Sequence, residues 1–169
     1  MMVYGDKMDS DFYSRIKRLV KTSFFTDEDL KLIFFDKEVS QIHNSISYLL
    51  KNGRIIKYKR GVYSLSDLRS SFSEYDLATS IYGPSYISFE AALSHHGLIP
   101  EAVQEVTSAC FLKKKKLFKT PVAIFSYTHS PVMPFLLEVE KVGNALMAGP
   151  IRALFDIVYR RKIKYTEIE

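Results

Sequence analysis

Cysteine is almost absent from this chain. Cys110 is the only one in 169 residues, so by itself the chain can form neither an internal disulfide nor a cysteine-based metal cage. It lies in an apolar stretch typical of a strand, where a buried, unreactive thiol is expected. No apolar run approaches the roughly 18 residues that a membrane helix needs, and residues 1–6 turn polar at once, without the apolar core of a signal peptide. These absences predict a cytoplasmic protein.

Several catalytic signatures are missing too. The sequence has no glycine-rich phosphate-binding loop, no Gly-x-Ser-x-Gly elbow and no His-Glu-x-x-His motif. The histidines are poorly spaced for a metal site, because His95 and His96 are adjacent and point in different directions, while His43 and His129 are remote. The sequence therefore predicts no metal, no other cofactor and no enzymatic activity.

Positive charge and bulky apolar side chains are plentiful. Lys and Arg number 24 against 19 Asp and Glu, and the 12 Phe and 11 Tyr suffice for a packed core, which excludes wholesale disorder. Residues 1–72 carry a net charge of +4, and residues 73–169 a net charge of +1. The excess in the first part lies after residue 50, and a localised positive patch suggests a polyanionic partner.

The first part of the chain has the pattern of three helices. Apolar residues recur at helical spacing from Phe12 to Val20, and Thr26 is placed to cap a second helix. A third helix is expected between a cap at Ser40 and Gly53, which supplies the left-handed residue that ends it. Its apolar residues fall on one stripe and its polar residues on the opposite face.

Two short strands are expected next, within residues 54–65, joined by a turn at Arg60-Gly61. Three helices and a hairpin in this order predict a winged helix-turn-helix. We place this domain at residues 9–66 and a serine-rich linker at residues 67–74.

The polar face of the third helix and the cations of the hairpin form the predicted DNA-binding surface. Its residues are Ser40, Gln41, His43, Asn44, Ser47, Tyr48, Lys51, Lys57, Lys59 and Arg60. In this fold the third helix enters the major groove, and the hairpin lies over a neighbouring phosphate strand or the minor groove. Asn44 and Gln41 can pair with an adenine edge, and the hairpin cations can neutralise phosphates. The alternative is a winged helix that binds protein through the same surface.

Residues 75–169 mix helices and strands, which predicts the fold class α+β: an N-terminal winged helix-turn-helix followed by a small mixed α/β domain. Helices are expected at 75–82, at 89–96 and from Pro150 onward, and strands at 106–112, 122–127, 135–142 and 145–148. The last helix is expected to bury Ile151, Leu154, Phe155 and Val158, and to place Arg152, Asp156 and Arg160 on its polar face.

A dense cationic run lies between two of these strands. It consists of Lys113, Lys114, Lys115 and Lys116. A solvated loop is the simpler interpretation, and a second nucleic-acid contact is the alternative.

Carboxylates on the strand at 135–142 leave an enzymatic alternative open. Glu138 and Glu140 would lie on one face of it, and a metal-dependent nuclease could combine them with a further acid such as Glu90 or Glu101. Alternating polar residues on a half-exposed strand are the commoner explanation.

Two further segments resemble a known family. Together with the hairpin residues Arg60–Tyr63, the segments Tyr86–Leu98 and Ala148–Asp156 resemble the AbiEi-type antitoxins of type IV toxin–antitoxin systems, in the order in which that family carries them. The resemblance extends from about Asp9 to Arg161.

The resemblance implies a DNA-binding antitoxin that represses its own operon through the winged helix. It also implies a functional partner, a nucleotidyltransferase toxin, that the C-terminal domain counters without a stable complex. Family members often continue with further helices after the segment that corresponds to Arg152–Leu154, so a stand-alone transcriptional regulator is the alternative within the same resemblance. Binding of a homodimer at inverted repeats of operator DNA is compatible with either role.

Overall fold

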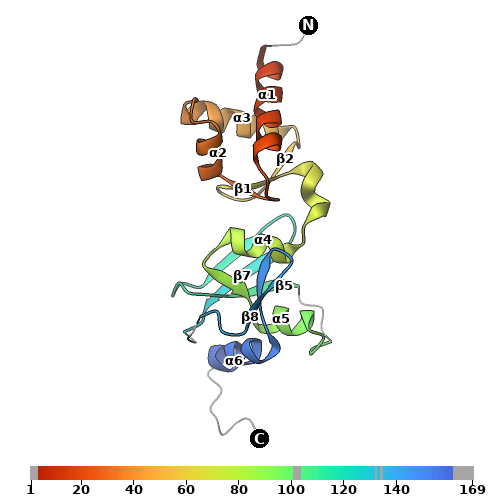
Figure 1. The fold of residues 1–169 in the computed structure, drawn as a ribbon, viewed down its shortest axis with the longest axis vertical. Coiled ribbons are helices and arrows are strands. Elements are labelled where there is room, and N and C mark those ends of the chain that lie inside the picture. The colour runs from red at the N-terminus through yellow and green to blue at the C-terminus, as the bar shows by residue number, and fades with distance from the viewer. Residues whose placement is uncertain (1–3, 101–103, 132, 134, 162–169) are drawn as a thin grey trace, which may run out of the picture. The chain divides into compact units, whose positions relative to one another are not determined.

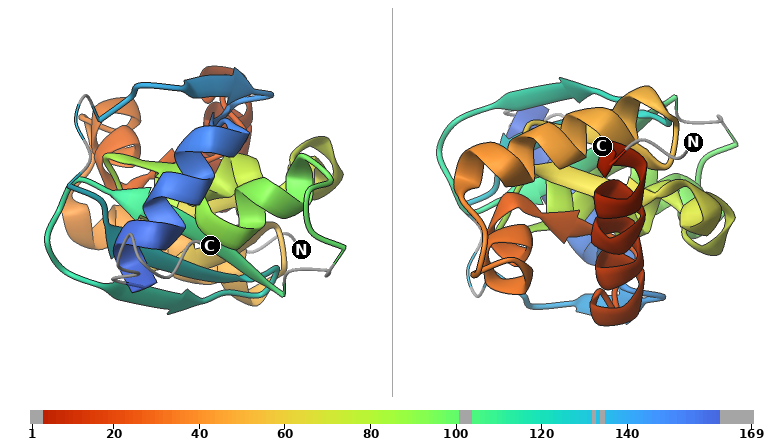
Figure 2. Two further views of the ribbon diagram at one scale, coloured as in Figure 1. Left: turned by 90° about the horizontal axis from the view of Figure 1, so that it is seen from below. Right: turned by 90° about the horizontal axis from the view of Figure 1, so that it is seen from above.

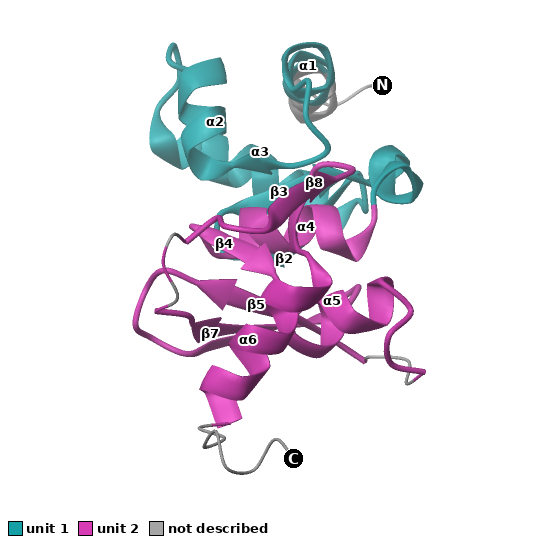
Figure 3. Ribbon diagram, turned by 60° about the horizontal axis from the view of Figure 1, so that its bottom comes forward, with its two compact units in different colours: residues 1–72 teal, residues 73–169 magenta. Residues whose placement is uncertain are grey.

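The computed structural model describes residues 4–100, 104–131, 133 and 135–161, and these form a mixed α+β fold with two sheets (Figure 1). The chain divides into two compact units, residues 1–72 (unit 1) and residues 73–169 (unit 2), shown in Figure 3. The division falls inside the segment 67–74, most of which forms the 3-10 helix η1 (Ser66–Ser71). Within the described ranges, no helix combines the length and apolarity needed to cross a membrane.

Unit 1 places three helices before a hairpin, in the order that the sequence predicts. The helices are α1 (Tyr4–Leu19), α2 (Asp27–Ile33) and α3 (Val39–Lys51), and the strands are β1 (Phe25–Thr26), β2 (Ile55–Lys59) and β3 (Val62–Leu65). The strands form an antiparallel sheet in the order β1-β3-β2. Strand β1 escapes sequence analysis because two residues are too short for an alternating pattern.

Apolar side chains from all three helices and the sheet form the core of unit 1. Phe12 of α1 stacks on Phe34, which caps the end of α2, with ring centroids 3.9 Å apart. Ile42, Ile46 and Leu49 of α3 lie in the same cluster. Because these three residues occupy one side of α3, its opposite side is left to solvent.

The helix caps in unit 1 agree with the sequence at one position and differ at another. Thr26 caps α2 as expected, because its Oγ1 accepts from the backbone N–H of Asp29 at 3.2 Å. The expected cap of α3 at Ser40 is wrong, since the capping position is Glu38 and the helix begins at Val39. The backbone N–H of Glu38 donates to Oε1 of Gln41 at 3.2 Å, which stabilises the earlier start.

Unit 2 is a six-stranded mixed sheet with helices on both faces. The strands are β4 (Ser85–Ile87), β5 (Glu105–Cys110), β6 (Lys116–Lys119), β7 (Ile124–His129), β8 (Val139–Val142) and β9 (Ala145–Ala148), in the spatial order β6-β7-β5-β4-β9-β8. The helices are α4 (Glu74–Ile81), α5 (Phe89–His95) and α6 (Pro150–Arg161). Figure 3 shows α4 on one face of the sheet and α5 and α6 on the other.

The expected orientation of the last helix is wrong. Arg152 and Asp156 are buried, with 2% and 1% of their surface exposed, whereas Ile151, Leu154 and Phe155 are exposed. The buried side, which also holds Ala153 and Ile157, accommodates this charged pair because other elements supply hydrogen bonds. The Asp156 carboxylate accepts from the hydroxyls of Tyr86, Ser88 and Ser130. The Arg152 guanidinium donates to the hydroxyl of Tyr86 and to the carbonyls of Phe135 and Leu137.

A hydrogen-bonded carboxylate at the start of α4 predicts a pH-dependent contribution to stability. Burial alone would raise the pKa of Asp76, but hydrogen bonds from Ser73 and from the backbone N–H of Asn144 lower that pKa below its ordinary value of 3.8. The ionised form therefore stabilises the fold above pH 3.8, and this contribution disappears as the pH falls through the lowered pKa.

We therefore expect Asp76→Asn to reduce the free energy of unfolding by about 1 kcal/mol at pH 7, the usual worth of a helix cap. Urea unfolding at pH 7 and near pH 3 measures the difference from the wild type, which should shrink at the lower pH. Glu74→Gln, an exposed carboxylate in the same helical turn, is the matched control. A deficit for Asp76→Asn that stays constant between the two pH values would contradict this prediction.

Candidate nucleic-acid interface

The outward face of α3 consists of the polar residues that the sequence assigns to it. All seven are exposed: Ser40, Gln41, His43, Asn44, Ser47, Tyr48 and Lys51. They share this face because the apolar residues of α3, at helical spacing, anchor the opposite side in the core of unit 1.

Local hydrogen bonds decide which of these side chains can read a base. Gln41 uses its Oε1 to accept from the backbone N–H of Glu38, and the Ser47 hydroxyl donates to the carbonyl of His43 at 2.8 Å. The side-chain amide of Asn44 makes no hydrogen bond with any described residue. Asn44 therefore offers both a donor and an acceptor to solvent, as a paired contact with adenine requires.

The β2–β3 hairpin is anchored by aromatic packing. The hydroxyl of Tyr58 forms a 2.9 Å hydrogen bond with Oγ of Ser64, and the Tyr58 ring packs edge-on against Phe24 and Phe72. At the turn, Gly61 has a φ of +76°, a conformation that side chains rarely adopt. The buried Tyr58 side chain and the glycine turn give the hairpin a defined structure, and the backbone N–H of Asp27, at the start of α2, donates to the carbonyl of Gly61 at 3.3 Å.

The three hairpin cations are not equivalent. Lys57 and Arg60 are exposed, but Lys59 is only half-exposed, and burial lowers its pKa while the Glu28 carboxylate opposes the shift. The strand register shifts between Lys57 and Lys59, so these two lysines do not share one regular face of β2. Lys57 and Arg60 are therefore the better placed to contact phosphates.

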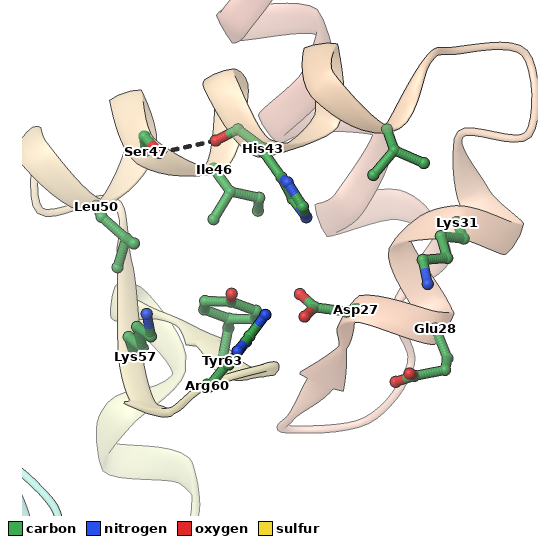
Figure 4. A pocket seen from close by; sticks show the side chains of 11 residues that line it. Asp27, Glu28, Lys31, His43, Ile46, Ser47, Leu50, Lys57, Arg60 and Tyr63 are labelled. Atoms are coloured by element: carbon green, nitrogen blue, oxygen red, sulfur yellow. Dashed lines mark hydrogen bonds between the residues drawn. The ribbon is translucent and has the colours of Figure 1, made fainter.

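A groove of about 460 Å³ joins α3, the start of α2 and the hairpin (Figure 4). His43 and Ser47 of α3 line it together with Lys57 and Arg60. From the α2 side, Asp27 points toward Tyr63, and burial followed by the Asp27 charge raises the pKa of the Tyr63 hydroxyl. The groove thus brings together predicted residues that lie up to 17 positions apart in the sequence.

The carboxylates that line this groove come from a single element. From Val39 to Ser66 the chain contains five Lys or Arg residues and no Asp or Glu. The carboxylates that line the groove, Asp27 and Glu28, both come from the first turn of α2. The part that α2 plays in this groove is not among the sequence-based predictions, although Asp27, Glu28 and Asp29 are three consecutive acids at the start of the helix. The hairpin therefore supplies a cationic edge of the groove, whereas the α2 edge carries two carboxylates and the cation Lys31.

All four lysines of the run in unit 2 are exposed. Lys113 to Lys115 lie in the connection between β5 and β6, and Lys116 begins the edge strand β6. Lysines at a sheet edge discourage pairing with another chain, which is a sufficient structural role. Whether they also contact nucleic acid stays a prediction.

Only two acids of the nuclease alternative lie together, because Glu138 and Glu140 line one pocket and no third acid of the described residues joins them there. Glu138 lies in a turn before β8, and Glu140 lies within that strand. Glu90 pairs instead with Arg160 and Arg161, and Glu101 is outside the described residues. In the part of the chain that the structure describes, no three His, Cys, Asp or Glu residues are grouped to hold a metal ion.

The side chains of Cys110 and His96 also have structural roles. Cys110 is buried, burial raises the pKa of its thiol, and the thiol donates to the carbonyl of Leu112. His96 lies at the end of α5, with its Nε2 3.0 Å from the carbonyl oxygen of Ala148. Both arrangements are those of side chains that support packing.

Comparison with known proteins adds no relative: no protein-family model matches the chain, and no curated protein matches it in sequence.

Proposed function

We propose that unit 1 is a winged helix-turn-helix that binds double-stranded DNA, with α3 in the major groove and the β2–β3 hairpin against the adjoining backbone. The observation that carries this proposal is the composition of one surface. Seven polar side chains of α3 are exposed, two of them line a groove with Lys57 and Arg60, and no carboxylate comes from α3 or the hairpin. Phosphates require such cations, and base edges require the amide and hydroxyl groups of α3.

The same surface is less suited to a protein partner. The core of a protein interface is enriched in aromatic and apolar residues, whereas the exposed large hydrophobic residues of α3 are only Tyr48 and Val39, among polar side chains. A positive, hydrogen-bonding surface is what the DNA backbone and grooves demand.

We further propose that DNA binding represses transcription, and that the chain is the antitoxin of a type IV toxin–antitoxin system. This part rests on the resemblance to AbiEi-type antitoxins, with a nucleotidyltransferase toxin as the functional partner. The segments that carry the resemblance in unit 2 contact each other, because Tyr86 and Ser88 bond to Arg152 and Asp156. A stand-alone regulator uses the same DNA-binding surface without the toxin.

Selection of duplex DNA from a randomised pool tests the proposal. The full chain is mixed with the pool, bound duplexes are recovered and sequenced, and the cycle is repeated. We expect a short enriched motif and weaker binding of the same sequence as a single strand. Recovery of no motif, or equal binding of single strands, would contradict major-groove recognition by α3.

Asn44→Ala is expected to relax the preference at one base pair of that motif. A paired amide–adenine contact contributes about 1–3 kcal/mol of discrimination. Anisotropy titrations with the selected duplex and its single-base variants measure this loss, and Ser14→Ala, at an exposed position of α1 that does not line the groove, is the control. A uniform loss of affinity on every sequence would show that Asn44 contacts the backbone instead.

A further inference from the structure

The outward face of α6 is apolar, which is unusual for a surface helix. Four of its large side chains are 54–61% exposed: Ile151, Leu154, Phe155 and Tyr159. At 100° per residue they fall within an arc of about 140°, and we call them the α6 stripe. In the view from below, α6 lies in front of α5 and the sheet (Figure 2, left). Single exposed apolar residues are ordinary, but a continuous stripe of them marks an interaction surface.

The two ends of the α6 stripe carry opposite charges. At the first turn, the exposed Glu138 and Glu140 line a pocket of about 570 Å³ with Pro150 and Ile151. At the last turn, Arg160 and Arg161 share the single carboxylate of Glu90, so one positive charge remains unbalanced, and the side chain of Arg161 is 59% exposed.

We propose that a second copy of this chain covers the α6 stripe, with the two α6 helices antiparallel about a two-fold axis. Phe155 is the midpoint of the stripe and meets its own counterpart at the axis, while Ile151 of each copy meets Tyr159 of the other. The same arrangement brings Arg161 of each copy to Glu138 and Glu140 of the other. A parallel arrangement would bring like charges together, so the charge pattern selects the antiparallel one.

This inference goes beyond DNA binding and does not depend on it. A two-fold pair carries two copies of unit 1, which is what an inverted repeat in DNA requires. The dimer concerns only unit 2, however, so a dimer that binds no DNA, or a monomer that does, would separate the two proposals.

Sedimentation of the full chain between about 1 and 100 µM tests the dimer. We expect a species of about twice the 19.5 kDa chain mass at the upper concentrations. Phe155→Glu places two unpaired carboxylates together at the axis and should weaken association at least about 30-fold. Leu117→Glu is the matched control, because Leu117 is 57% exposed on β6, at the sheet edge opposite β8, and should leave association unchanged.

Exchange of charges tests the orientation of the helices. Glu140→Arg alone and Arg161→Glu alone should each weaken the dimer, and the double variant should recover most of the loss, because each copy then regains complementary ends. A chain that stays monomeric at 100 µM or so, or a dimer that Phe155→Glu weakens no more than Leu117→Glu, would overturn the proposal. Additive losses in the charge-exchange variant would overturn the antiparallel arrangement.

Discussion

Replacing Asp156 with alanine is expected to reduce the free energy of unfolding of unit 2 by about 3–5 kcal/mol, the cost of leaving one member of a buried ion pair alone. The carboxylate is 1% exposed and accepts hydrogen bonds from Tyr86 at 2.9 Å, Ser88 at 2.6 Å and Ser130 at 2.6 Å. Burial, and then the charge of Asp156, raise the pKa of Tyr86 to about 12, which keeps this hydroxyl a donor. The substitution also removes the ion pair between this carboxylate and the Arg152 guanidinium, 3.5 Å away.

Urea unfolding monitored by circular dichroism measures this loss. Lys141→Met, which removes an exposed charge from β8, is the control and should lie within about 0.5 kcal/mol of the wild type. Arg152→Met should cost a similar amount to Asp156→Ala, and the double variant should cost clearly less than the sum of the two. An Asp156→Ala variant as stable as the control would refute the buried network.

The second large effect is expected in DNA binding. Lys57→Ala/Arg60→Ala should shallow the slope of log affinity against log salt by about 2, since each phosphate contact on duplex DNA contributes about 0.9. With this change of slope, the affinity of the variant relative to that of the wild type falls about 60-fold when the salt is lowered from 1 M to 0.1 M. A further Lys59→Ala substitution should shallow the slope by less than the value of one phosphate contact, because Lys59 is half-buried and lies near Glu28.

Arg18→Ala/Lys21→Ala is the matched control for this experiment. It removes the same two charges from exposed positions of unit 1 that do not line the groove. Titrations at several salt concentrations should leave its slope at the wild-type value. Equal slopes for the hairpin variant and the wild type would mean that the hairpin contacts no phosphate.

Local patterns in the sequence were sufficient to predict which residues form the polar face of α3. Helical spacing of Ile42, Ile46 and Leu49 determines which side is buried, and the polar residues between them are consequently exposed. The left-handed glycines, Gly53 at φ +64° and Gly61 at φ +76°, were equally visible as ends of a helix and a strand. Such features depend on residues close in sequence.

The orientation of α6 could not be predicted in the same way. Apolar periodicity favoured burial of Ile151, Leu154 and Phe155, but the partners that make Arg152 and Asp156 the buried pair lie far away in sequence. Tyr86 is 70 residues from Asp156, and Ser130 is 26 residues from it. A buried charge is tolerated only where such partners exist, and the pattern of one helix contains no information about them.

The exposure of the hairpin lysines and the position of the α2 acids could not be predicted from local patterns either. Alternation along β2 would give Lys57 and Lys59 equal exposure, but a register shift against β3 separates them. Asp27 and Glu28 were visible as helix-start residues, while their position across the groove from Lys57 depends on how α2 packs beside the hairpin. Distances across a groove come from tertiary packing, which no local pattern encodes.

Backbone amide chemical shifts of the full chain, recorded with and without the selected duplex, test the DNA-binding proposal most directly. The account predicts that the largest shift changes fall on residues 40–51 and 57–60, and that they are reduced in the Lys57→Ala/Arg60→Ala variant. Largest changes within residues 105–119 or on α6, with the amides of α3 unmoved, would contradict it.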